Sequence, residues 1–331
     1  MQTTTIQQPT TNHDDCCDPS PLLPPLIQTF DTAIDELIDG TNTSFANAVK
    51  DVISLSEISK TQPDFTNGDK IPLIQYEAGT NLVSSSSSTS SSKSLLFTPT
   101  IASKVRKIMG FVGYHPTIDA LVHHPKLVKI VSRLLVHSKS SNSIGSANDS
   151  NATTGVDQNT EIELFQDMAL LKPPNGGREK PWHQDKAYFN LHISEPVVGC
   201  WIAIDPATID NGCLRFEMKT KHTTTTATEQ LVESSHSPEM HYMVRDYQIC
   251  DTVDRRGKVI AIPLPPGGMI LFDGMIPHGT PTNNNNNNNN NKTASRRRRA
   301  LQFHWTRKDP KRCTTQERYK TFGGIPNGLS C

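Results

Sequence analysis

The 331-residue chain has 33 basic and 33 acidic side chains, and only 34% of its residues are hydrophobic. This length allows two ordinary domains, but the low hydrophobic content and long polar runs predict one domain with polar insertions. No signal peptide is recognisable and no apolar run approaches the roughly 20 residues that a membrane span needs, so we expect a cytoplasmic protein that is neither secreted nor membrane-spanning. The seven cysteines show no paired spacing that suits zinc, and their odd number argues against a closed disulfide framework.

The charges are distributed unevenly along the chain. Residues 1–60 carry nine acidic and two basic side chains, a net charge of −7, whereas residues 292–320 carry eleven basic and two acidic side chains, a net charge of +9. The basic segment includes four consecutive arginines at 296–299. Such a segment binds the phosphates of a nucleic acid or of a phosphorylated small molecule, or docks onto the acidic start of the chain. Charge alone leaves these possibilities open.

The first half of the chain has helical patterns. Residues 1–21 are polar and predicted to be disordered. Apolar residues between Leu26 and Leu37 recur with helical spacing up to Gly40, and a second helix is predicted over residues 44–56. Helical patterning resumes near Ile101 and continues to residue 137, where Pro125 is predicted to end one helix and start the next. The Ser/Thr run at 84–94 and the Ser/Asn/Thr-rich stretch at 138–160 are predicted to be flexible insertions.

Beyond residue 160 the pattern changes to short β-rich runs separated by turn residues. The clearest are VVGCWIAI, GCLRFEM, KVIAIPL and GGMILFD. Helices followed by strands predict a mainly β fold with flanking α-helices, a jelly roll of two packed sheets. We therefore expect a disordered N-terminus (1–21), a single domain over 22–309 with a helical part (22–137) and a jelly-roll core (160–309), and a basic tail (310–331). A third insertion, 283–295, contains nine asparagines and is predicted to be a loop tip.

Three residues of this β-rich half could bind a metal ion. In PWHQDKAY, His183 and Asp185 lie two residues apart on a predicted extended segment, which puts both side chains on one face. Downstream, LFDGMIPHGT supplies His278 after a strand and a turn. Two histidines and one carboxylate can hold Fe(II) and leave three coordination positions open. A His-x-Asp pair alone is a weak signal.

The four-arginine run leads into a predicted strand, RRRRALQFHW, with two different faces. One face carries Arg299, Leu301, Phe303 and Trp305. The other carries Arg298, Ala300, Gln302 and His304. Because the apolar face should pack away from a cavity, Arg298 should point inward, where its planar fork suits a carboxylate. The remaining arginines of the run, and the cluster Arg307, Lys308, Lys311 and Arg312, are predicted to face solvent or bind phosphate.

Together these residues resemble the phytanoyl-CoA dioxygenase family of Fe(II)/2-oxoglutarate-dependent oxygenases. The similar segments are, in order, MALLKPPNGG, WHQD, CWIAIDPATIDNGCLRF, PPGGMILFDGMIPHGT and RRALQFHW. The resemblance implies a double-stranded β-helix with His183, Asp185 and His278 as catalytic metal ligands. It also implies that Arg298 binds the 2-oxoglutarate carboxylate. The other residues that it places in the co-substrate pocket are Lys104, Met168, Trp201 and Thr280.

The resemblance further implies an enzyme that uses Fe(II), O2 and 2-oxoglutarate, with ascorbate as a supporting reductant. It would hydroxylate a small organic substrate and release succinate and CO2, and a basic rim would favour an anionic substrate such as an acyl-CoA. Because Asp185 is present, where a small residue would leave room for a halide, hydroxylation is the expected chemistry. The segment FEMKTKH departs from the family's usual Pro-Gly-Ser-His turn, so the role of His222 stays open.

Two other functions remain as alternatives. A nucleic-acid oxidative demethylase of the same chemistry is supported only by the basic segment, which lacks interleaved aromatic residues, so we do not expect a nucleic-acid partner. A non-catalytic jelly-roll binding protein is the second alternative, and the complete set of metal ligands argues against it.

Overall fold

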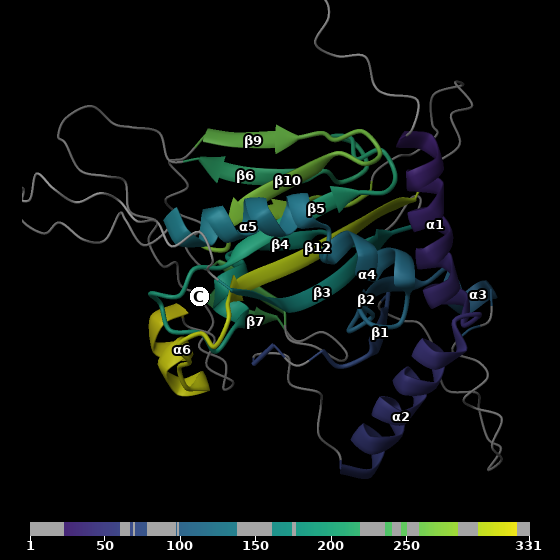
Figure 1. Cartoon of the computed structure of the whole chain (residues 1–331), viewed down its shortest axis with the longest axis horizontal. Helices are drawn as coiled ribbons and strands as arrows, with labels where there is room; N and C mark the ends of the chain where they lie inside the picture. Colours follow the sequence, from purple (N-terminus) through teal and green to yellow (C-terminus); the bar gives the residue numbers. More distant parts are fainter. Residues whose placement is uncertain are drawn as a thin grey trace, which may run out of the picture.

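The computed structural model describes residues 23–59, 67–68, 70–77, 97, 99–137, 161–173, 177–218, 236–239, 246–249, 258–283 and 297–322. Two antiparallel sheets form the centre of the molecule, with helices along one side (Figure 1). The predicted disordered start, the predicted insertions at 84–94 and 138–160, the asparagine run from residue 284 and His222 lie outside these residues.

The larger sheet has six strands in the order β1-β2-β3-β12-β5-β10. Their bounds are β1 (Leu73–Tyr76), β2 (Val105–Met109), β3 (Ile162–Lys172), β12 (Arg298–Arg307), β5 (Val198–Ala203) and β10 (Met269–Asp273). The smaller sheet has the order β4-β11-β6-β9. It consists of β4 (Lys180–His183), β11 (His278–Thr280), β6 (Leu214–Met218) and β9 (Lys258–Ile262). Strands β7 (His236–Glu239) and β8 (Asp246–Ile249) form a separate pair.

The two sheets share an apolar layer, to which β5, β12 and β10 contribute from one sheet and β6 from the other. Its largest members are Trp201, Phe216 and Phe272. The arrangement is a jelly roll, the double-stranded β-helix, and confirms the predicted mainly β fold with flanking helices. Each β-rich run of the sequence between residues 197 and 273 contains one of these strands.

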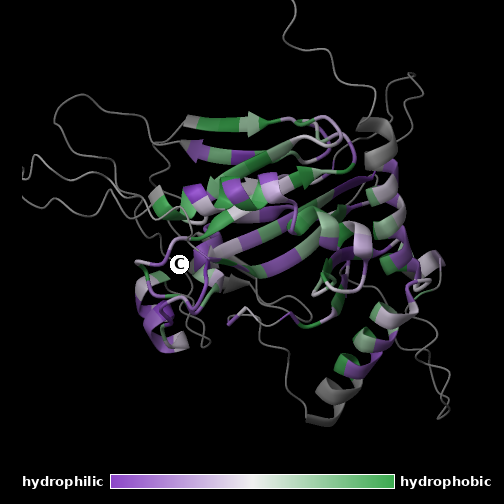
Figure 2. Cartoon of the chain, viewed as in Figure 1, coloured by the Kyte–Doolittle hydropathy of each residue, from purple (hydrophilic) through white to green (hydrophobic). Residues whose placement is uncertain are grey.

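Helices cover the outer face of the larger sheet. They are α1 (Leu23–Asp39), α2 (Thr43–Ser59), α3 (Pro99–Ala102), α4 (Pro116–Val122) and α5 (Pro125–His137). A further helix near the end of the chain, α6 (Thr315–Phe322), packs instead against the segment after β4 and the turn before β11. Ile34 of α1 and Val131 of α5 belong to the same apolar cluster as Leu301 and Phe303 of β12. Figure 2 shows the mixed hydropathy of these helices, as expected for helices with one buried face. The helices predicted before Gly40, over 44–56 and on each side of Pro125 are confirmed.

The prediction of continuous helix from Ile101 is wrong for residues 105–109, which form strand β2. Strand β1, not predicted from the sequence, pairs with β2, and β2 pairs with β3. The turn after β2 is held by the buried carboxylate of Asp167, which accepts hydrogen bonds from the backbone of Gly110, Phe111 and Val112 at 3.2, 2.6 and 2.8 Å. Asp167 lies more than 50 positions away, on strand β3, which also pairs with β2. Contacts with this distant strand therefore override the local helical pattern.

Part of the predicted basic tail belongs to the folded domain. Residues 315–322 form α6, and Phe322 packs against Ala187 and Met275. Arg318 of α6 is 2% exposed and donates to the carbonyl of Ala187 at 2.7 Å and to the side chain of Asn190 at 2.9 Å. Within the described part of the chain, no helix is both long and apolar enough to span a membrane.

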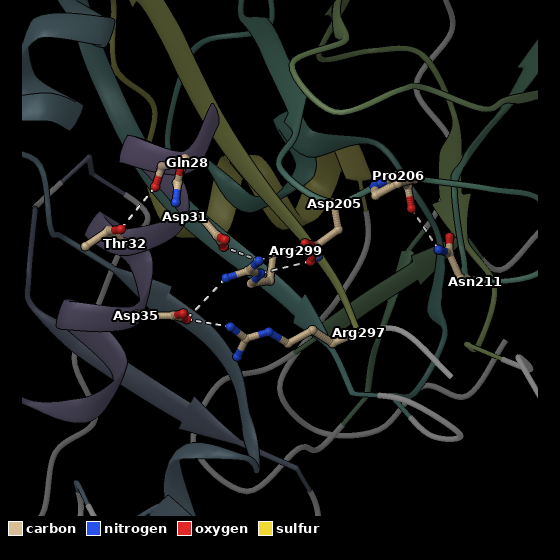
Figure 3. Close-up of polar contacts among 9 residues, drawn as sticks. All are labelled: Gln28, Asp31, Thr32, Asp35, Asp205, Pro206, Asn211, Arg297 and Arg299. Atoms are coloured by element: carbon tan, nitrogen blue, oxygen red, sulfur yellow. Dashed lines mark hydrogen bonds and ion pairs between the residues drawn. The ribbon is translucent and has the colours of Figure 1, made fainter. Parts of the chain in front are cut away.

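Two members of the four-arginine run bind the first helix. Arg299 is 6% exposed, and its guanidinium donates to both carboxylate oxygens of Asp205 at 2.9 and 2.7 Å. It also forms ion pairs with Asp31 and Asp35 of α1. Arg297 donates to Asp35 at 2.5 Å. Figure 3 shows these three carboxylates around the start of β12.

The prediction that these arginines face solvent or bind phosphate is therefore wrong for Arg299, which is buried. Arg297 is partly exposed, but its guanidinium is paired. The later basic residues also have partners: Arg307 donates to the carbonyl of Leu135 at 2.8 Å, Lys308 to Glu161 at 2.6 Å and Arg312 to the carbonyl of Asn67 at 2.8 Å. Arg297, Arg299, Arg307, Lys308 and Arg312 thus contact the chain itself, including the acidic first helix, as opposite net charges favour. Lys311 is exposed, as predicted.

We expect Arg299→Met to lower the free energy of unfolding by about 1–3 kcal/mol, because Asp205 and the α1 carboxylates lose charge-assisted hydrogen bonds. Urea denaturation followed by circular dichroism measures the change. Lys308→Met is the control, since the exposed Lys308–Glu161 pair should add nothing measurable to stability. Equal midpoints for wild type and Arg299→Met would contradict a stabilising role for the cluster.

Candidate active site

The structure brings His183, Asp185 and His278 together. His183 ends β4 and lies directly opposite His278, the first residue of β11. Gln184 is extended, with φ −108° and ψ 128°, and Asp185 then begins a 3-10 turn, η3 (Asp185–Tyr188). The Nε2 atoms of His183 and His278 lie 3.4 and 3.5 Å from Asp185 Oδ1. One possible ligand atom from each residue lies within 4.8 Å of the other two.

Both imidazoles turn the same nitrogen toward Asp185. Nδ1 of His183 donates to the carbonyl of Pro181 at 2.7 Å, and Nδ1 of His278 donates to that of Ile276 at 2.9 Å. Each Nε2 therefore keeps its lone pair for a metal ion. Burial lowers the pKa of His183 to about 3 and also lowers the pKa of His278. Both rings are neutral at pH 7, the form in which histidine binds metals.

Asp185 has one oxygen held and the other facing the histidines. Burial favours a raised pKa for its carboxyl, but His278 and His304 outweigh this effect and hold the pKa well below its usual range. Its Oδ2 accepts hydrogen bonds from His304 Nε2 at 2.8 Å and from Gln302 Nε2 at 3.3 Å. Two neutral imidazoles and one carboxylate oxygen form a donor set that fits Fe(II) with further positions open.

Backbone contacts fix the segment that carries Asp185. The amide of Lys186 donates to the carbonyl of Gly274 at 3.1 Å, and the side chain of Gln184 donates to the carbonyl of Met275 at 2.7 Å. The ammonium of Lys186 donates to the carbonyl of Ile193 at 2.7 Å. The His183–Asp185 segment is thereby tied to the turn that leads to His278, although the two lie about 90 residues apart.

We expect His304→Phe to weaken Fe(II) binding by about 10–100-fold, because the hydrogen bond that orients Asp185 is lost while the ring still packs against Phe189. Anaerobic Fe(II) titration measures the dissociation constant. Phe303→Leu, on the opposite face of β12, is the control and should lower stability without changing Fe(II) affinity. Unchanged Fe(II) affinity in His304→Phe would contradict the orienting role.

Arg298 points into the space between the sheets, as the alternation of β12 predicts. It is 1% exposed, and its Nε and Nη1 have no hydrogen-bond partner among the described residues. Its guanidinium carbon lies 5.4 Å from the ring centre of Trp201, whose Nε1 is also buried without a partner. Burial lowers the pKa of Arg298 to about 10, which leaves it charged at pH 7. A buried cation without a partner is costly, so this side chain suits an anionic ligand such as a carboxylate.

The structure also brings the predicted pocket residues Met168, Trp201 and Thr280 to the interior. Met168 and Trp201 lie opposite Gln302 on its two neighbouring strands, and so share the inner face of the sheet. Thr280 lies on β11 two residues after His278 and is 8% exposed. These residues therefore surround the same interior as the metal-binding candidates.

The family model for phytanoyl-CoA dioxygenase (PhyH) matches residues 48–288, more than two thirds of the chain. The chain belongs to the phytanoyl-CoA dioxygenase family. The matched region includes His183, Asp185 and His278, whereas Arg298 lies beyond its end.

The phytanoyl-CoA dioxygenase domain-containing protein 1 homolog of Caenorhabditis briggsae is 28% identical over 123 residues, which are 37% of this chain and 42% of that protein. The Mus musculus phytanoyl-CoA dioxygenase domain-containing protein 1 is 27% identical over 121 residues, 36% of this chain and 40% of that protein. The similarity thus spans about two fifths of the length of these relatives.

Solved structures with similarity to this chain include EvdO2 from Micromonospora carbonacea var. aurantiaca complexed with 2-oxoglutarate. The identity is 22% and the TM-score 0.38, over 62% of this chain and 70% of that chain. EctD from S. alaskensis, with 2-oxoglutarate and 5-hydroxyectoine, is 17% identical with a TM-score of 0.39, over 62% and 57% of the two chains.

Lys104 does not reach the interior of this phytanoyl-CoA dioxygenase family member. It is exposed in the turn before β2, so the predicted contact with the co-substrate is wrong. Lys107 lies within β2 opposite Leu170, which lies opposite Ala300 of the apolar layer between the sheets. Lys107 therefore occupies the inner face. Predicting this segment as helix concealed the alternation that distinguishes the two lysines.

Sequence reasoning missed the part that Gln302 and His304 play at Asp185. The alternation of β12 had placed both on the face of Arg298, and that pattern was the available signal.

Two aromatic residues follow Asp185 closely in the sequence. Phe189 is 1% exposed and packs against Phe165. Tyr188 is partly exposed, with its ring 5.7 Å from that of His183.

Proposed function

We propose that this chain is an Fe(II)- and 2-oxoglutarate-dependent oxygenase that hydroxylates a small organic substrate and releases succinate and CO2. The observation that carries the proposal is the shared interior of two features, the His183/Asp185/His278 cluster and the buried Arg298, whose Nε and Nη1 have no hydrogen-bond partner among the described residues. The first suits the metal ion and the second a carboxylate of the co-substrate. Membership of the phytanoyl-CoA dioxygenase family supports the same chemistry.

Each residue has a defined task in this proposal. When bound, Fe(II) supplies O2 activation coupled to the oxidative decarboxylation of 2-oxoglutarate. The two imidazoles and Asp185 Oδ1 hold the ion, and Gln302 and His304 keep that oxygen in place. Arg298 binds the far carboxylate of 2-oxoglutarate through a charge-assisted fork. Met168, Trp201 and Thr280 line the pocket, and their burial keeps bulk water away.

Hydroxylation rather than halogenation is proposed because Asp185 occupies the position that a halide would need. The presence of a bound carboxylate ligand leaves three positions for the co-substrate and O2 and none for an additional anion. The proposed use of ascorbate as a supporting reductant follows from the family chemistry alone. The anionic substrate suggested by the basic segment loses support, because Arg299 and Arg307 are paired within the chain.

The nucleic-acid alternative loses much of the same support, since Arg297, Arg299, Arg307, Lys308 and Arg312 have internal partners. A non-catalytic binding protein would not need two neutral imidazoles and an oriented carboxylate within 4.8 Å. Metal content distinguishes this last alternative directly.

Anaerobic absorption titration tests the proposed function. Fe(II) is added to the protein and then 2-oxoglutarate, and a visible charge-transfer band is expected. Glutarate, which lacks the 2-oxo group, should give no band by itself but should suppress the band by competing for Arg298. Succinate formation on admitting O2 is then measured by mass spectrometry. Protein that binds Fe(II) but forms no band with 2-oxoglutarate would exclude the proposed co-substrate.

A further inference from the structure

A second buried basic side chain lies beside Arg298. Lys172, the last residue of β3, lies directly opposite Arg298 in the β3–β12 pair and is 5% exposed. Residues opposite one another in an antiparallel pair project from the same face of the sheet. Both basic side chains therefore lie at one end of the space between the sheets. Within the described part of the chain, no carboxylate forms an ion pair or hydrogen bond with either of them.

The ammonium of Lys172 binds backbone carbonyls from two other segments. It lies 2.5 Å from the carbonyl oxygen of Arg178, in the loop before β4, and 2.7 and 3.5 Å from those of Pro281 and Thr280, at the end of β11. Its methylene chain packs against the turn before β6, because a Cβ atom on Gly212 would lie 3.0 Å from Lys172 Cδ. One side chain thus joins three segments around the end of the interior that contains Arg298.

We propose that Lys172 is a positioning residue of the co-substrate pocket: it fixes the segments around Arg298 and adds a second positive charge for the far carboxylate of 2-oxoglutarate. This inference rests on the proposed function. It explains why two basic side chains are buried side by side, an arrangement that an apoprotein alone does not favour. A dicarboxylate that presents one charged end to this part of the interior offsets that cost.

The charge state of Lys172 gives the proposal a specific signature. Burial, with Arg298 and Arg106, lowers the pKa of Lys172 to about 6, and Glu77 and Glu179 oppose this only in part. The ammonium form has three N–H donors for the three carbonyl oxygens, whereas the neutral amine has only two. A carboxylate bound at Arg298 favours that form and raises the pKa again. Binding of 2-oxoglutarate at pH 8 should therefore take up a proton, and the affinity should fall as pH rises.

Two other titratable groups act on Arg298: the carboxylate of Asp205, which binds Arg299, and the thiol of Cys213. Burial raises the pKa of this thiol, so it stays protonated at pH 8 and binds no further proton when an anion arrives. Proton uptake at this pH can therefore be assigned to Lys172.

Anaerobic isothermal titration of the Fe(II)-loaded protein with 2-oxoglutarate, at pH 8 in two buffers of different ionisation enthalpy, counts the protons taken up. Wild type should take up close to one proton. Lys172→Met should take up none and bind 2-oxoglutarate about tenfold more weakly, with unchanged Fe(II) stoichiometry. Lys172→Arg keeps a permanent charge and should bind 2-oxoglutarate without proton uptake. The exposed control Lys308→Met should match wild type.

The outcomes distinguish failure of the proposed function from failure of the role of Lys172. Wild type that binds Fe(II) but not 2-oxoglutarate overturns both the proposed function and the role of Lys172. Wild-type binding that is matched by Lys172→Met in affinity and proton count overturns the role of Lys172 alone. If the methionine variant does not fold, Lys172→Arg decides, because proton uptake that persists in this variant cannot come from residue 172.

Discussion

Replacing His183 by alanine should reduce 2-oxoglutarate turnover to background while the protein stays folded. The substitution removes one of three metal ligands, and Asp185 and His278 cannot complete the donor set. The fold should persist because His183 ends the short strand β4 and its ring makes one hydrogen bond to the backbone, to the carbonyl of Pro181. Succinate formation, Fe(II) stoichiometry and near-ultraviolet circular dichroism measure the three properties.

His123→Ala is the matched control, since His123 is exposed in the turn after α4 and lies outside the interior between the sheets. It should retain wild-type turnover and Fe(II) binding. Full activity in His183→Ala would rule out the assignment of the metal site, whatever the behaviour of the control.

Replacing Arg298 by methionine should raise the 2-oxoglutarate concentration needed for half-saturation by about 100-fold, through the loss of two charge-assisted hydrogen bonds worth roughly 1.5 kcal/mol each. The same variant should be more stable than wild type without 2-oxoglutarate. A buried guanidinium that has unpartnered nitrogens is costly, and an apolar side chain of similar length removes that cost. The titration of the charge-transfer band and thermal denaturation of the ligand-free protein measure the two effects.

Arg297→Met is the control for this pair of effects, because Arg297 is bonded to Asp35 of α1 and not to the interior. Its 2-oxoglutarate requirement should equal that of wild type. A methionine variant at 298 that loses stability and keeps its 2-oxoglutarate affinity would show that Arg298 is a structural residue.

The opposite behaviour of Arg298 and Arg299 follows from their neighbouring positions in one strand. Alternation sends Arg298 to the interior and Arg299 to the outer face. Among the described residues no carboxylate pairs with Arg298, whereas the outer face offers Arg299 the carboxylates of Asp205, Asp31 and Asp35 (Figure 3). The same side-chain type is thus poised to bind a ligand at one position and anchors a helix at the next.

The sequence by itself determined the elements whose signals are local. The helices on each side of Pro125 follow from periodicity, and the inward direction of Arg298 follows from the two-residue period of a strand. The pairing of His183 with Asp185 could be predicted because one extended residue separates them. Their relation to His278 was inferred from a ligand pattern and a family resemblance, and the structure brings the three together.

Only the tertiary structure decided the features that depend on partners far along the chain. Residues 105–109 are a strand because β3 pairs with them and Asp167 binds the turn that follows. Lys107, not Lys104, faces inward for the same reason. Arg299 binds Asp205, which lies 94 residues away in the sequence. Lys172 binds the carbonyl of Pro281, which lies 109 residues away. Hydrogen bonds and charges act over a few ångströms in space, and sequence periodicity does not record which distant groups the fold brings within that range.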